Sequence, residues 1–245
     1  CDTSFQLHTY QRKGASEKVY VRPEVQYKET STKVEEWFKT RGINKQTLTD
    51  LRVGEGQEFM PQTGKQENTI QFNYYMGDQL INIKYRDGRK NFKLFKGAEK
   101  VFYNINSIVG YDTCVIVEGE MDVLALHEAG IPNAISVPNG ATLNRNNLDY
   151  LDNCIDYFED KNKIIIAVDA DEPGQMLQRE LVRRLGADVC YLVDFNGNKD
   201  ANEFLLEHGT ESLRSAIHAA RPVPLENVST LKDIEDELKD FVKNG

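Results

Sequence analysis

The chain has 245 residues, with 30 Lys or Arg against 39 Asp or Glu, so its formal net charge at pH 7 is −9. This length allows one or two domains with substantial cores. The acidic balance excludes a uniformly basic coat for nucleic acid and confines any such surface to a local patch. The longest apolar run, Ile164 to Val168, is far shorter than the ~20 residues of a membrane span.

The cysteines indicate a reducing compartment. Cys1, Cys114, Cys154 and Cys190 never approach the close pair spacing of a zinc ribbon. We therefore expect no zinc site within this chain and a cytoplasmic protein with reduced core thiols. Because the chain begins at Cys1 rather than at Met, we also expect it to be a piece of a longer protein.

The first part of the chain is predicted to be an arm followed by a small mixed subdomain. Residues 1–30 are polar with little periodicity, which indicates an arm or linker with one short strand at 19–21. Residues 31–109 begin with a helix that ends at Gly42. From residue 69 to residue 95 apolar and polar residues alternate between turn signals, which predicts a three-stranded antiparallel meander.

Residues 110–220 alternate between strand and helix patterns with short links. This alternation predicts an α/β domain with a parallel sheet and right-handed crossovers. After the last strand we expect two short helices that end near Ala220. The expected strands are Thr113–Glu118, Ala134–Val137, Ile164–Val168 and Asp188–Leu192.

Residues 221–245 are expected to form a linker helix. A proline-rich break comes first, and apolar residues then recur at helical spacing, at Leu231, Ile234, Leu238 and Phe241. An isolated amphipathic helix cannot bury its apolar stripe alone. We therefore expect it to pack on a further domain or on another subunit.

Carboxylates follow three of the expected strands. Glu118 ends the first strand, and Asp169 and Asp171 follow the third. Asp200 comes after the fourth strand. The carboxyl ends of parallel strands meet at one sheet edge, where open α/β folds bind ligands. A cluster of hard oxygen ligands suits Mg²⁺ or Mn²⁺ and therefore phosphate chemistry.

Three further acidic residues stay undecided, namely Glu120, Asp122 and Glu172. Asp122 could equally favour the N-terminus of its helix through the helix dipole. We expect Trp37, in the first helix, to be a core residue with Phe38 rather than a platform for stacking on bases.

A run of cations precedes the second domain. Residues 84 to 100 contain seven Lys or Arg and only two acidic residues. Aromatic residues interleave with the cations: Tyr85, Phe92 and Phe95. The run could be a nucleotide surface whose rings stack on bases, or the solvated face of a hairpin with its rings in a core. Alternation predicts that Lys84 and Arg86 share one face and Tyr85 the other.

Three motifs together resemble the Toprim domain: Glu118-Gly119-Glu120, Asp169-Ala170-Asp171 and Lys199-Asp200-Ala201-Asn202-Glu203. The Toprim family comprises bacterial primases, topoisomerases and some nucleases. Two further segments, Lys84–Lys93 and Val137–Ala141, are similar to the fused primase-helicases of tailed phages, a group that includes the mitochondrial helicase Twinkle. The charged helix after the proline-rich break is similar as well, so the resemblance runs from about residue 69 to the C-terminus.

The resemblance implies an α+β N-terminal subdomain packed against an α/β Toprim domain, with a cleft between them. It implies that Glu118 acts as general acid or base near the reacting phosphate. The implied metal-side carboxylates are Asp169, Asp171 and Asp200. The implied nucleotide- or template-binding residues are Lys84, Arg86, Lys90 and Lys93.

By this resemblance the chain is expected to be a DNA primase core that makes short RNA primers on single-stranded DNA from ribonucleoside triphosphates. A zinc module and a replicative helicase are the expected neighbours. The chain has no P-loop, so it cannot itself carry the ATP-driven helicase activity. Two alternatives stay open, which are a primase-inactive platform for single-stranded DNA beside a helicase and a Toprim nuclease. A topoisomerase would need a DNA-gate domain for which the chain has no room.

Overall fold

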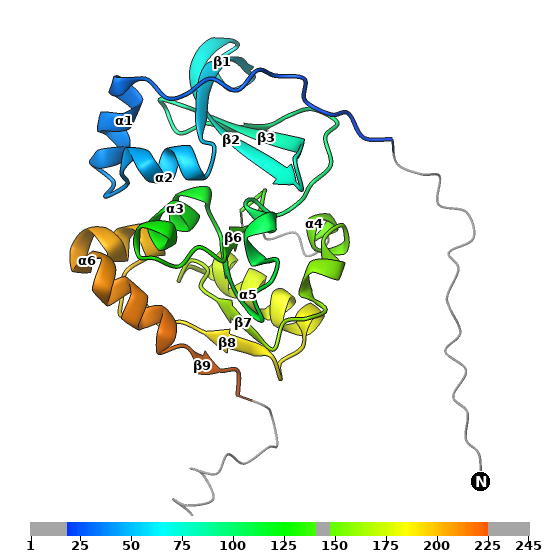
Figure 1. Cartoon of the computed structure of the whole chain (residues 1–245), viewed down its shortest axis with the longest axis vertical. Helices are drawn as coiled ribbons and strands as arrows, with labels where there is room; N and C mark the ends of the chain where they lie inside the picture. Colours follow the sequence, from blue (N-terminus) through cyan, green and yellow to red (C-terminus); the bar gives the residue numbers. More distant parts are fainter. Residues whose placement is uncertain (1–18, 141–147, 225–245) are drawn as a thin grey trace, which may run out of the picture.

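The computed structural model describes residues 19–140 and 148–224, which form two sheets with their helices. Figure 1 shows the first sheet, with α1 (Thr32–Lys39) and α2 (Lys45–Asp50) beside it, stacked above the second. The expected C-terminal helix and most of the arm lie outside the described residues. Among those described, no helix has the length and apolar character to cross a membrane.

The N-terminal sheet has four antiparallel strands. Its strands, in sheet order, are β1 (Gly54–Met60), β2 (Lys65–Met76), β3 (Gln79–Asp87) and β4 (Phe92–Leu94). The last three are the predicted meander. The first was not predicted, because β1 carries two glycines and three polar residues and lacks apolar alternation. The expected strand at 19–21 is not formed, although the amide of Val21 donates to the carbonyl of Gly97 at 2.9 Å.

The two faces of the N-terminal sheet differ in chemistry, as the alternation predicted. Phe72 pairs with Lys84 and Ile70 with Arg86, so these four side chains share the face toward the second domain and α1. Tyr85 lies on the opposite face, buried in a small core of its own. The sheet therefore presents its alternate cations toward the α/β domain.

The second sheet has five strands, and four of them run parallel to one another. Those strands, β6 (Ala134–Ser136), β5 (Thr113–Val117), β7 (Lys163–Ile166) and β8 (Cys190–Leu192), pair in parallel, and β9 (Arg221–Pro222) closes the edge antiparallel. The central strands are β-branched and buried, as strands covered on both faces must be. The predicted parallel sheet is confirmed.

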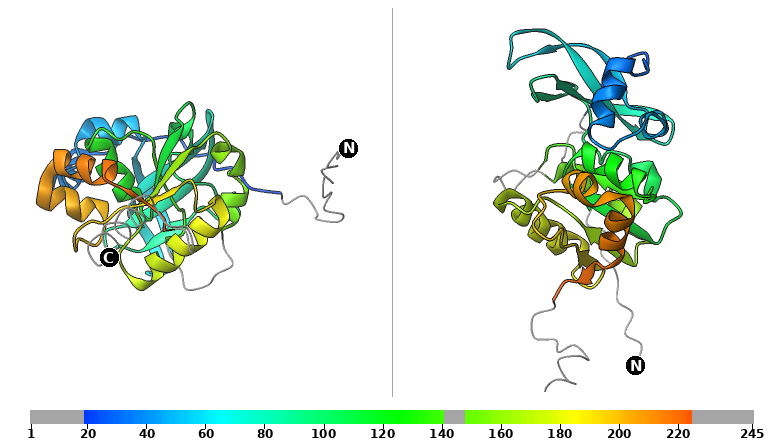
Figure 2. Two further views of the ribbon diagram at one scale, coloured as in Figure 1. Left: turned by 90° about the horizontal axis from the view of Figure 1, so that it is seen from below. Right: turned by 90° about the vertical axis from the view of Figure 1, so that its left-hand side faces the viewer.

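Helices cover both faces of this sheet (Figure 2). The first face carries α3 (Glu120–Glu128) and α6 (Ala201–His218), and the other carries α5 (Glu172–Leu185). Shorter elements complete the domain: η1 (Ile105–Ile108), α4 (Asp149–Asp152) and η2 (Ile155–Phe158). Gly209 interrupts α6 with a φ of 81°, which produces the two short helices that the sequence predicted.

One continuous core joins the two halves. Tyr103 lies at the junction, where its ring meets the rings of Phe72 and Tyr74 edge-on at 6.0 and 5.2 Å. Its hydroxyl donates to the carbonyl of Leu51 at 3.1 Å, and its backbone pairs with Ser136 in the second sheet. The N-terminal sheet is therefore packed firmly against the carboxyl edge of the second sheet rather than tethered beside it.

Candidate active site

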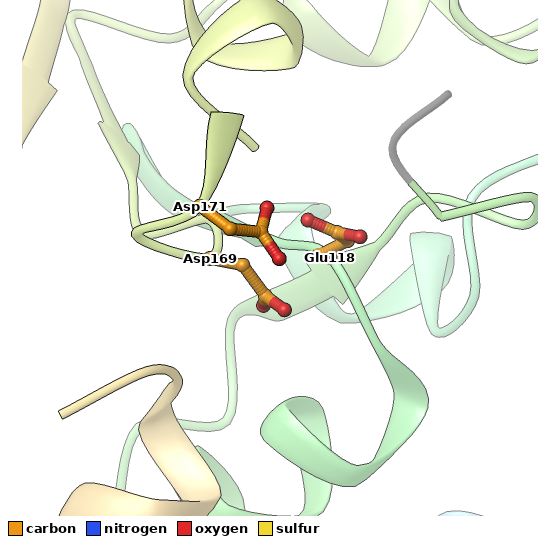
Figure 3. A group of neighbouring side chains, drawn as sticks. All are labelled: Glu118, Asp169 and Asp171. Carbon is orange, nitrogen blue, oxygen red and sulfur yellow. The ribbon is translucent and has the colours of Figure 1, made fainter. Parts of the chain in front are cut away.

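Three carboxylates meet at the carboxyl edge of the second sheet. Glu118 follows β5, and Asp169 and Asp171 follow the adjacent parallel strand β7. One carboxylate oxygen from each of the three lies within 4.8 Å of the others. Figure 3 shows the three side chains converging on one point. Hard oxygen ligands at this spacing fit a divalent cation such as Mg²⁺ or Mn²⁺.

Helix starts hold two of the acidic residues in place. Asp171 caps α5 and accepts the amide of Gly174 at 3.0 Å. A Cβ at Gly174 would lie 2.1 Å from the carbonyl oxygen of Asp169, so only glycine lets α5 begin this close to the site. Asp200 caps α6 by accepting the amide of Glu203 at 2.8 Å.

The roles that the resemblance implies for these carboxylates stay predictions. It assigned the metal to Asp169, Asp171 and Asp200 and general acid–base chemistry to Glu118. The structure places Glu118 in one group with Asp169 and Asp171, while Asp200 lines the same cleft outside that group.

Lys199 lies between two of the carboxylates. Its ammonium is 3.0 Å from a carboxylate oxygen of Asp169 and 3.7 Å from one of Asp171. The hydrogen bond and charge of Asp169 raise the pKa of Lys199. A lysine of the sequence motif thus supplies positive charge to the cluster from within the chain.

Asp122, left undecided by the sequence, belongs to the acidic cluster. It is buried and accepts the amide of Asn202 at 3.0 Å. Burial, then the charges of Asp200 and Asp169, raise its pKa well above the usual range for Asp. Asp122 lies in the first turn of α3, three residues after the N-cap Gly119. Its place in the turn that directly follows Glu118 was the signal available in the sequence.

A wall of cations faces this edge across a cleft of about 580 Å³. Three of the four predicted basic residues line the cleft, namely Lys84, Arg86 and Lys90. Lys93 does not, because it pairs with Tyr85 across the strands and lies on the other face, where its ammonium binds Glu58. Burial, then the charge of Arg41, lower the pKa of Arg86.

Trp37 lines the cleft and also packs against the core. Phe38 is fully buried, as expected, but Trp37 is only half-buried and lines the cleft. The guanidinium of Arg86 lies 4.5 Å from the centroid of the Trp37 ring and 6.0 Å from that of Phe92. Trp37 packs against the core, as expected. The sequence did not predict that part of its ring lines the cleft, because a helical stripe does not show which neighbour the helix meets.

Part of this chain is similar in sequence to a known family of domains. Residues 115–205 match the family model for Toprim-like domains. The chain contains a Toprim domain. The carboxylates Glu118, Asp169 and Asp171 described above all fall within this match.

Two curated relatives come from Arabidopsis thaliana. The chain is 33% identical over 222 residues to its "Twinkle homolog protein, chloroplastic/mitochondrial", which covers 84% of this chain and 30% of that protein. It is 36% identical over 211 residues to the plant's "Primase homolog protein", which covers 79% of this chain and 61% of that protein. This chain therefore spans less than two thirds of the length of either relative.

Among solved structures, the primase fragment of the bacteriophage T7 primase-helicase has the same fold. It aligns with a TM-score of 0.62 at 22% identity and covers 78% of this chain and 74% of that fragment. An N-terminal antiparallel sheet followed by a Toprim-type α/β domain is therefore a primase fold.

Replacing Lys199 should tighten metal binding. Lys199→Gln removes a cation that lies 3.0 Å from Asp169, so an incoming Mn²⁺ or Mg²⁺ meets less repulsion. We expect an increase of about tenfold in affinity, which corresponds to ~1.4 kcal/mol, measured by titration calorimetry. Lys65→Gln, at the exposed start of β2, is the matched control. Unchanged or weaker binding by Lys199→Gln would show that Lys199 does not compete for the metal position.

Replacing Asp122 should stabilise the metal-free protein at neutral and alkaline pH. The folded-state pKa is raised, so between the unfolded and folded pKa values only the folded chain holds the proton. This contribution to stability is present at low pH and is lost as the pH rises through the folded pKa. Asp122→Asn keeps an acceptor for the Asn202 amide and carries no charge.

The measurement is thermal unfolding in chelator between pH 5 and pH 8. At the upper end we expect Asp122→Asn to melt roughly 2–4 °C above the wild type, the shift that ~1 kcal/mol produces in a chain of this size. The difference in melting temperature between the variant and the wild type should narrow toward acid pH. Asp156→Asn, at an exposed position of η2, controls for surface charge. If this difference in melting temperature is absent or independent of pH, burial and neighbouring carboxylates do not disfavour the ionised form of Asp122.

Proposed function

We propose that this chain is the catalytic core of a DNA primase, a nucleotidyltransferase that makes short RNA primers on single-stranded DNA. One observation carries the proposal: the acidic edge, with Glu118 and Asp169, and the cation wall, with Arg86 and Lys90, line the same cleft. The primase fold and the two Arabidopsis relatives support the same family of reactions.

The reaction joins a 3′-hydroxyl to the α-phosphate of a ribonucleoside triphosphate and releases pyrophosphate. Bound Mg²⁺ or Mn²⁺ would supply neutralisation of phosphate charge and a lowered pKa of the hydroxyl. We assign Asp169 and Asp171 to holding the metal, with Asp200 as a further carboxylate on that side. To Glu118, whose carboxylate faces theirs, we assign the role of accepting the proton of the attacking hydroxyl.

The cation wall has a separate task in this proposal. Carboxylates repel phosphate, so a facing positive surface is needed to bring nucleotide and template close. Arg86 and Lys90 are the proposed phosphate contacts. Within the part of the chain that the structure describes, neither forms an ion pair with a carboxylate, so both cations are available. Lys84 was expected to serve in the same way, and Lys93 could do so only on the outer face of the sheet.

We propose that the single strand crosses the cleft mouth at Trp37. A second hollow, of about 750 Å³, lies on the far side of the Trp37 and Arg86 pair and shares both residues with the cleft. Its acidic residues are already occupied. Glu55 binds Lys28 and Ser31, and its pKa falls to about 2. Asp87 likewise accepts three hydrogen bonds within its own turn. The hollow is thus compatible with an anionic strand.

We infer that the active protein has further domains and works in a reducing compartment such as the cytoplasm. The relatives extend well beyond the matched region, and a zinc-binding module and a replicative helicase are the proposed neighbours. Cys114, Cys154 and Cys190 are free and buried, and burial raises the pKa of Cys114 to about 12. Thiols of this kind remain protonated and unreactive.

Loss of Glu118 should abolish most of the nucleotide transfer. The assay gives the chain a DNA template with an annealed RNA primer, Mg²⁺ or Mn²⁺ and labelled ribonucleotides, so that initiation by a zinc module is bypassed. We expect Glu118→Gln to lower incorporation by about 10²-fold or more, because the group that accepts the proton is lost. Glu172→Gln, at the exposed first residue of α5, is the control. Equal incorporation by wild type and Glu118→Gln would rule out the assigned role.

The same assay separates the alternatives. A platform that binds single-stranded DNA beside a helicase, as the likeness to the Twinkle homolog suggests, would bind DNA without incorporating nucleotide. A nuclease would shorten an end-labelled DNA template in the presence of Mn²⁺. Neither result is expected from the wild-type chain.

Removing the Trp37 ring should weaken the binding of single-stranded DNA. Stacking of a base on an aromatic ring contributes about 1–3 kcal/mol, so Trp37→Ala should lower affinity by roughly 5- to 150-fold. Fluorescence anisotropy of a labelled oligonucleotide measures this. Trp37→Phe, which keeps a ring, should lose much less. If Trp37→Ala binds as tightly as the wild type, the strand does not pass over this ring.

A further inference from the structure

A buried ion pair joins the two domains at the cleft. The ammonium of Lys84, on β3, lies 2.9 Å from both carboxylate oxygens of Glu120, the first residue of α3. Lys84 is only 9% exposed and Glu120 only 3%. The sequence assigned Lys84 to nucleotide binding and left Glu120 undecided, because no sequence pattern pairs residues that lie 36 positions apart.

Tyr74, from β2, is the third member of this group. Its hydroxyl donates to a Glu120 oxygen, and burial followed by the charge of Glu120 raises its pKa well above the usual range for Tyr. Tyr74 is fully buried, and its ring packs against that of Tyr103 at the junction of the domains. Side chains from two neighbouring strands of the N-terminal sheet therefore bind one carboxylate of the Toprim domain.

The position of Glu120 links these contacts to the acidic edge. Glu118 and Asp122 flank it by two residues on either side, so the pair is anchored in the same short turn that carries two carboxylates of the acidic edge. Any movement of β3 relative to α3 would move the cation wall and the acidic edge apart. Removal of one partner from a buried pair leaves an uncompensated charge, which is strongly unfavourable.

We propose that Lys84 is a positioning residue that latches the cation wall to the acidic edge through Glu120, rather than a phosphate contact. A phosphate that drew the Lys84 ammonium away from both Glu120 oxygens would leave a buried carboxylate without its cation. Arg86 and Lys90 line the same cleft without carboxylate partners among the described residues, so phosphate binding does not require Lys84. The role in catalysis rests on the proposed primase function, whereas the latch itself is a property of the fold.

A double-mutant cycle tests the latch. The variants are Lys84→Met, Glu120→Gln and the two together. Lys90→Met is a matched change of a cleft lysine that forms no ion pair with any residue in 19–140 or 148–224. Urea unfolding measures the stability of each full chain. We expect both single variants to lower the midpoint, and the double variant to regain at least half of the loss. The coupling should amount to about tenfold or more in the unfolding equilibrium. Lys90→Met should leave the midpoint unchanged.

The second readout separates positioning from substrate contact. In primer extension, Lys90→Met should mainly raise the KM for the nucleotide. Lys84→Met should mainly lower kcat, and the double variant should recover part of that loss. Emission from Trp37, the single tryptophan, reports on the wall directly, and it should shift in the single variants and return toward wild type in the double. Tyr74→Phe removes only one hydroxyl and provides a milder variant where Lys84→Met folds poorly.

Additive stability losses would overturn the latch. So would a double variant that keeps a raised KM equal to that of Lys84→Met, since Lys84 would then contact the substrate. If the wild-type chain extends no primer at all, the proposed function fails, but the urea cycle and the Trp37 emission still decide whether the latch exists.

Discussion

Mutual repulsion among carboxylates is the constraint on which the rest of this structure depends. Glu118, Asp122, Asp169, Asp171 and Asp200 all reach one sheet edge, and Asp122 is buried there. At separations near 4 Å, two like charges repel by ~1 kcal/mol in water and by ~4 kcal/mol at the effective dielectric of a protein surface. Burial, and then the charges of neighbouring carboxylates, raise the pKa values of Asp122 and Asp169.

The surrounding structure offsets this charge in several ways. Lys199 enters the cluster from the loop before α6, and helix starts bind Asp171 and Asp200 through backbone amides. Amide dipoles at a helix start favour a carboxylate there. The N-terminal sheet then presents its cations on one face only, because alternate side chains of β3 point to opposite sides. The cleft with two oppositely charged walls follows from strand parity and from the packing at Tyr103.

The sequence predicted those parts of the site that depend on local pattern. Buried β-branched strands followed by Glu118, Asp169 and Asp171 placed three carboxylates at one edge. Alternation correctly separated Lys84 and Arg86 from Tyr85. The strand β1 could not be predicted, because its glycines and polar residues carry no periodic signal. Its place comes from pairing with β2 over seven residue pairs, which no local window contains.

Partners distant in the sequence were the other source of error. Lys93 belongs to the same basic run as Lys84, yet it pairs with Glu58 on the outer face. Composition counts charges but does not assign them to faces. Lys84 itself has a carboxylate partner on another domain, so a cation that looked available for phosphate is neutralised within the fold. Trp37 and Asp122 show the same limitation, since domain packing decides their exposure.

The energetic penalty of the acidic cluster helps to choose between the proposed functions. A platform that only binds single-stranded DNA needs the cation wall and gains nothing from carboxylates opposite it, because these repel the phosphate backbone. A metal-dependent polymerase needs both walls, since the carboxylates must hold the metal that the phosphates then share. Asp122 is kept inside the cluster although its pKa shows that ionisation there is unfavourable. A fold that tolerates this repulsion at the start of α3, and fixes the same turn through Glu120, is arranged to place carboxylates rather than to minimise electrostatic energy. That arrangement supports the proposed catalysis at this edge.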